Sequence, residues 1–162
     1  MHAEMTDEVA IVTGASREMS TRVRGLLGNS LAALVMLLVQ FSLGISLNLY
    51  STLPASDHGK SLFPGFAAAV SKGPALLVLH ALLGTLLLVT AAAALVRSTR
   101  LGAAQPIVLT AAALLAIVVA WLAGSAFVGH EKNGASLAMA LATAVAILCY
   151  ALVIFVVRIQ EA

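Results

Sequence analysis

Long apolar runs alternate with short polar segments along the whole chain. Four of these runs contain no Asp, Glu, Lys or Arg over 23 or 24 residues. A helix of that length extends about 35 Å, against a hydrocarbon core of about 30 Å in a bilayer. Because the backbone must satisfy its own hydrogen bonds in lipid, runs of this length are predicted to be helical. The predicted spans are Leu26–Leu49, Pro74–Val96, Pro106–Val128 and Ala135–Val157.

The pattern predicts an all-α fold, an integral membrane four-helix bundle over residues 26–158. A polar N-terminal tail, residues 1–25, precedes it, and an outer loop, residues 50–73, joins the first two spans. Within that loop, Phe63 and Phe66 flank a Pro-Gly pair, which fits either a short interfacial segment covering the bundle or an ordinary loop with aromatics at headgroup depth. Composition agrees with a membrane protein, since 61% of the 162 residues are hydrophobic and 10% charged, against about 25% charged in soluble domains.

The distribution of cations sets the expected orientation. Six arginines fall on the side that holds both termini, and three lysines fall on the other side. By the positive-inside rule, both termini are predicted to be cytoplasmic, in a multi-pass protein of the inner (plasma) membrane. The residues are Arg17, Arg22, Arg24, Arg97, Arg100 and Arg158 on the first side, and Lys60, Lys72 and Lys132 on the second.

Several function classes are excluded by what the chain lacks. The stretch EVAIVTGASRE, residues 8–18, is similar to the start of a short-chain dehydrogenase, but Glu18 and Ser20 stand where the phosphate-binding glycines belong. An NAD-dependent dehydrogenase is therefore not expected. The net charge of +2 is too small and scattered for nucleic acid. The single Cys149 excludes an intrachain disulfide and a C-x-x-C-H haem attachment, and the spans hold no carboxylate for proton-coupled export.

One histidine lies inside a predicted span. His80 follows Pro74 by six residues, and an unpartnered imidazole in hydrocarbon costs several kcal/mol, so it should face the bundle. Segments HALLG and MALAT place His80 and Met139 at similar depth on alternate helices. Segments QFSLG and AWLAG do the same for Gly44 and Gly124 on the other pair. A haem b held between helices needs such a set: two axial ligands, and small residues where the macrocycle meets a backbone.

The same residues have a purely structural interpretation. The imidazole of His80 would then bond a neighbouring helix through Ser42, Ser46 or Asn48. Met139 would fill space, and the glycines would allow close helix packing. A third arrangement is a metal site at the outer surface, for which the candidate ligands are Asp57, His58, His130 and Glu131.

The segments LLVQFSLGISLN and VLHALLGTLLLV resemble the first and second helices of one four-helix half of haem A synthase, and the chain is also similar to small four-span bacterial membrane proteins. The resemblance covers about residues 30–96. It implies that His80 matches the second-helix haem ligand, whereas the fourth-helix histidine is replaced by Met139. The acidic residue of the family's catalytic half has no counterpart in the first span, which implies no synthase activity.

Two functions remain. The first is a non-catalytic accessory or assembly subunit of a larger membrane complex, with the lipid bilayer and other membrane protein helices as partners. The second is a small b-type cytochrome that transfers electrons near the outer face. Its cofactor-binding residues would be His80, Met139, Gly44 and Gly124.

Overall fold

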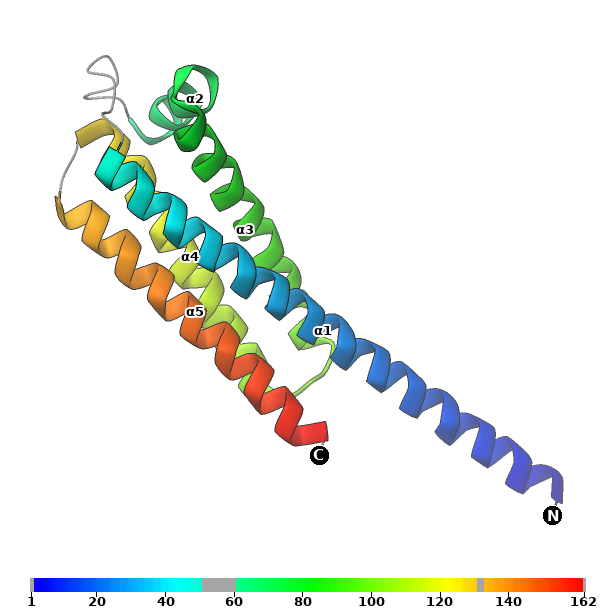
Figure 1. The fold of residues 1–162 in the computed structure, drawn as a ribbon. Helices are drawn as coiled ribbons and strands as arrows, with labels where there is room; N and C mark the ends of the chain where they lie inside the picture. Colours follow the sequence, from blue (N-terminus) through cyan, green and yellow to red (C-terminus); the bar gives the residue numbers. More distant parts are fainter. Residues whose placement is uncertain (1, 51–60, 131–132, 162) are drawn as a thin grey trace.

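The computed structural model describes residues 2–50, 61–130 and 133–161, and within these ranges all regular structure is helical (Figure 1). Four helices are long and one is short. Their bounds are α1 His2–Tyr50, α2 Leu62–Lys72, α3 Ala75–Thr99, α4 Ala104–His130 and α5 Asn133–Glu161.

The four long helices carry segments that are long and apolar enough to cross a bilayer, which confirms the predicted fold class. Each of these helices packs against two others, so that α1, α3, α4 and α5 form a ring in chain order. Helices α1 and α4 are therefore diagonal to each other, as are α3 and α5. The segments that satisfy the length and composition requirements are Ser16–Tyr50, Ala75–Thr99, Ala104–Ala126 and Gly134–Ile159.

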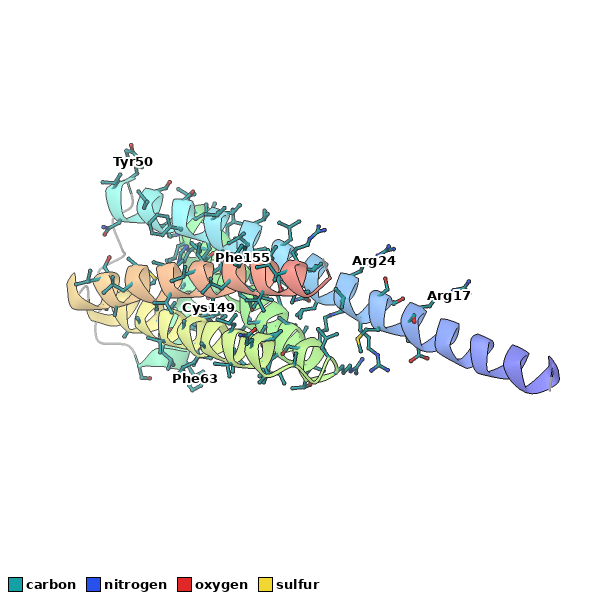
Figure 2. All side chains as sticks on the ribbon, turned by 90° about the horizontal axis from the view of Figure 1, so that it is seen from below. Arg17, Arg24, Tyr50, Phe63, Cys149 and Phe155 are labelled. Atoms are coloured by element: carbon teal, nitrogen blue, oxygen red, sulfur yellow. The ribbon has the colours of Figure 1, made fainter. Side chains whose placement is uncertain are left out.

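Helix α1 is much longer than a membrane span and projects beyond the other helices (Figure 1). The segment expected as a polar tail, residues 1–25, is helical from His2 onward, and the TGAS stretch lies within that helix rather than in a strand and turn. Figure 2 shows Arg17 on the projecting part and Arg24 close to the point where α1 joins the bundle. Both termini lie at this end of the bundle, here called the termini end; the opposite end, which carries α2, is the α2 end.

The half of the bundle nearer the termini is closely packed. Its buried cluster combines alanines with a few larger side chains, among them Leu26, Leu87 and Tyr150, each at most 2% exposed. Small residues let helix backbones approach each other, which is the main source of packing energy between helices in lipid. Polar links reinforce this half: Asn29 Nδ2 donates to the Thr90 carbonyl at 3.0 Å, and the hydroxyls of Ser98 and Thr110 lie 2.8 Å apart.

The connections between helices are short and locally specified. Between α3 and α4, Gly102 adopts φ +70°, a left-handed conformation that favours glycine and ends α3 in a tight turn. At the α2 end, the segment expected as a loop contains α2, which packs against α3 and α4. Gly65, Ala68 and Ala69 form its buried face, while Phe63 is exposed and Figure 2 shows it pointing away from the bundle.

Candidate functional site

A cavity of about 470 Å³ lies in the α2-end half of the bundle, and all five helices contribute to its wall. Most of the lining is apolar, with a few polar side chains among the aliphatic and aromatic ones. Mainly apolar cavities of 300–1,000 Å³ with a small number of polar groups are typical of small-molecule and cofactor sites. The cavity is therefore the candidate site of this protein.

His80, on the first turns of α3, lines this cavity. Its ring packs over the backbone of α1, since a Cβ added at Gly44 would lie 3.3 Å from His80 Cε1. The Nδ1 atom is enclosed and has no hydrogen-bond partner among the described residues. Nε2 is not enclosed in this way, so it is the candidate ligand atom of this ring.

Gln40, one turn deeper on α1, fixes the backbone of this region. Its Nε2 donates to the carbonyl oxygen of His80 at 3.0 Å, which joins α1 to α3 beside the cavity. The two hydroxyls expected to pair with the imidazole bond the backbone of their own helix instead. Ser42 donates to the Leu38 carbonyl and Ser46 to the Ser42 carbonyl, each at 2.9 Å. The imidazole is therefore held by packing rather than by a hydrogen bond to α1.

Met139, on α5, lines the same cavity from the diagonal helix. A Cβ added at Gly124 of α4 would lie 3.3 Å from the Met139 sulfur, so the thioether packs on the α4 backbone as the imidazole packs on α1. The structure thus brings together all four residues singled out in the sequence, His80, Met139, Gly44 and Gly124. The two candidate ligands come from one diagonal pair of helices and the two glycines from the other.

The deeper wall of the cavity contains polar groups that the sequence did not single out as a site. Trp121 of α4 and Gln40 of α1 both approach Gly84 of α3: a Cβ there would lie 3.8 Å from Trp121 Cδ1 and 3.1 Å from Gln40 Nε2. The indole Nε1 of Trp121 and the Oε1 of Gln40 are buried without a partner in the described part of the chain. Trp121 is the only tryptophan in the sequence and carries a hydrogen-bond donor into an apolar span. That donor is the feature by which the sequence could have indicated Trp121 as a site residue.

Helix α2 covers part of the cavity. Phe66 lines it and packs against Trp121 in a tilted arrangement, with ring centroids 5.4 Å apart and planes inclined by 44°. On the other side, Ala69 of α2 packs with Leu77 of α3 and Leu47 of α1. Two alternatives were considered for this segment: a short segment that covers the bundle, and an ordinary loop. The structure has a helix packed against the bundle, with Phe66 on it.

The proposed surface metal site falls outside what the structure describes: Asp57, His58 and Glu131, and the side chain of His130, are not among the described groups. Over the described residues, no three His, Cys, Asp or Glu side chains come close enough to hold a metal ion. Comparison with known proteins returned no matching family model, no matching curated protein and no matching solved structure.

Proposed function

We propose that this integral membrane protein is a small b-type cytochrome that binds haem b in the cavity, where His80 and Met139 would hold the iron. One observation supports this most directly. An imidazole and a thioether, placed on diagonal helices, line a single apolar cavity whose size suits a cofactor. When bound, haem supplies one-electron redox chemistry, and His/Met ligation raises its potential.

The donor set fits that group in its chemistry. Neither ring nitrogen of His80 has a hydrogen-bond partner among the described residues, and Nε2 is the nitrogen left open. The Met139 sulfur is an uncharged soft ligand and needs no deprotonation before it binds iron. Gly44 and Gly124 were expected to meet the macrocycle, but the His80 ring and the Met139 sulfur lie against them instead, so the glycines would seat the two ligands rather than the haem ring.

The surrounding residues would orient the ligands and exclude water. Gln40 holds the helix segment of His80 through its carbonyl, so that the imidazole projects from a fixed backbone. Leu37, Leu87 and Ile117 line the deeper wall and Phe66 covers part of the cavity, so most of the lining is apolar. An apolar shell around a ligated iron would further raise the reduction potential.

The role of accessory or assembly subunit stays a prediction. All four spans carry exposed apolar side chains, which fits contact with lipid. Because every span has them, they do not single out one helix as the contact for a protein partner. Location in the inner membrane, with cytoplasmic termini, is likewise an inference from the arginine distribution.

The proposal is tested by the visible spectrum of protein purified in mild detergent after expression with a haem precursor. We expect a Soret band that shifts on reduction and disappears in His80→Ala. The control is His58→Ala, which removes another histidine of the same chain from a predicted loop. A folded, colourless wild-type protein that also fails to take up added hemin would overturn the proposal.

Met139 is tested separately through the redox potential. Met139→His replaces a thioether with an imidazole and should lower the potential on the order of 0.1 V, within the ~0.8 V range that axial ligation spans. A coloured variant with an unchanged potential would exclude Met139 as a ligand and leave His80 in place.

A further inference from the structure

A second set of polar side chains lies at the termini end, where α1 leaves the bundle beside the end of α3. Arg22 of α1 donates through Nη1 to the carbonyl oxygen of Arg100, the C-cap residue of α3, at 3.3 Å. One turn along α1, a Cβ added at Gly25 would lie 2.9 Å from Arg97 Nη1. Gly25 thus lets the Arg97 guanidinium lie against the α1 backbone, and arginines of two helices meet at one place.

The positive charge of this group is poorly compensated. Glu18 lies 3.3 Å from Arg22, in an ion pair whose members are both largely exposed, and exposed pairs of this kind contribute about 0–1 kcal/mol. It is the single ion pair found among the side chains that the structure describes. Arg22, Arg97 and Arg100 are all exposed. Arg22 already donates through its two Nη atoms to the Arg100 carbonyl and to Glu18, whereas the guanidinium groups of Arg97 and Arg100 have no hydrogen bond to a described residue and are available to an anion.

The position along the membrane normal restricts what that anion is. The apolar run of α1 begins at Leu26, directly after Gly25, and that of α3 ends at Val96, directly before Arg97. Val96 is exposed on the bundle surface, as expected for a lipid-facing residue. The arginine group therefore stands where hydrocarbon gives way to headgroups, the depth of lipid phosphates.

We propose that Arg22, Arg97 and Arg100 form a binding site for the phosphate of an anionic glycerophospholipid, beside the contact between α1 and the end of α3. Guanidinium groups recognise phosphate oxygens through paired, charge-assisted hydrogen bonds. Basic groups between transmembrane helices are a recurring way to hold anionic lipid headgroups. The site is separate from the cavity and does not depend on haem.

Lipid retention by the full-length protein in detergent tests the proposal, with native mass spectrometry as the readout. Phosphatidylglycerol should be retained in preference to phosphatidylcholine, and Arg22→Gln with Arg97→Gln should weaken its retention about tenfold. Arg158→Gln is the matched control for Arg97→Gln alone, because Arg158 stands at the same end on α5 and its substitution also removes one charge. Equal retention of both lipids would overturn the proposal. So would a loss of phosphatidylglycerol retention in Arg158→Gln as large as in the single variant Arg97→Gln.

Gly25→Leu separates geometry from charge. It displaces the mobile end of Arg97 without altering net charge, and should weaken retention of phosphatidylglycerol several-fold. Gly28→Leu, at a position with nothing within 4 Å, should leave retention unchanged. Inorganic phosphate forms the last arm: displacement of the lipid by millimolar phosphate alone would identify a free anion site and overturn the assignment to a lipid.

Discussion

At the scale of single residues, the informative groups are buried polar atoms without partners. Three of them, Gln40 Oε1, His80 Nδ1 and Trp121 Nε1, belong to residues that line the same cavity. Each unsatisfied polar atom costs about 1–3 kcal/mol when it is buried. Three such atoms around one cavity make this half of the bundle costly to form, and departures of this kind from optimal packing are expected at functional sites.

The glycine beside the candidate ligand provides a residue-scale prediction. Gly44→Val places carbon atoms against the His80 ring, whose Cε1 would be 3.3 Å from the new Cβ. A ring cannot fold away as a flexible chain can, so we expect haem affinity to fall about tenfold, or ~1.4 kcal/mol. Titration with hemin, followed by Soret absorbance, measures this.

The matched control is Gly28→Val, on the same helix with nothing within 4 Å of the added Cβ. Gly124→Ala should have a smaller effect than Gly44→Val, because the Met139 side chain that it approaches is flexible. Unchanged affinity in Gly44→Val would show that the imidazole is not the group that receives the cofactor.

At the scale of elements, α2 covers part of the cavity while contributing little to the ring of spans. Gly65, Ala68 and Ala69 let it pack closely against α3 and α4, and Phe66 is its contact with Trp121. Because Trp121 is the only tryptophan, its fluorescence reports on the cavity without labelling.

Phe66→Ala should expose the indole of Trp121 and move its emission to longer wavelength. The lost ring contact is worth about 0.5–1.5 kcal/mol beyond the area it buries, so the melting temperature should also fall. Fluorescence spectra and thermal unfolding in detergent measure both effects. Phe63→Ala, on the same helix at a position that is 76% exposed, is the control and should change neither. A red shift of equal size in both variants would show that Phe66 does not cover Trp121.

At the scale of the whole molecule, the bundle divides into two halves with different roles. The termini half is filled by alanines and a few large side chains, such as Tyr150, which form one buried cluster. The α2 half is hollow and holds the polar side chains discussed above. Close packing in one half stabilises the helices, while the other half is free to enclose a ligand.

Topology is a prediction at this scale, and cysteine labelling tests it. In a Cys149→Ala background, Met19→Cys and Ile159→Cys probe the termini end, while Phe63→Cys probes the α2 end. All three positions are at least half exposed. A membrane-impermeant maleimide should modify the Phe63→Cys protein in intact cells, and the other two only after permeabilisation. Modification of Met19→Cys and Ile159→Cys from opposite sides would contradict an even number of spans.

Sequence alone determined the number, type and approximate position of the membrane spans, because 23 or more apolar residues without charge have one stable form in lipid. It also placed His80, Met139, Gly44 and Gly124 at one depth, since helical rise converts sequence position into depth. That they share a cavity was decided by the tertiary structure, because the rotation of each helix about its axis depends on its neighbours.

The same reason explains what the sequence left undetermined. The approach of Gln40 and Trp121 to Gly84, the covering position of α2 and the meeting of Arg22 with Arg100 each join residues of different helices. Apolar periodicity is weak in a helix surrounded by lipid and other apolar helices, so it does not fix which face turns inward. Only the packed bundle makes that choice.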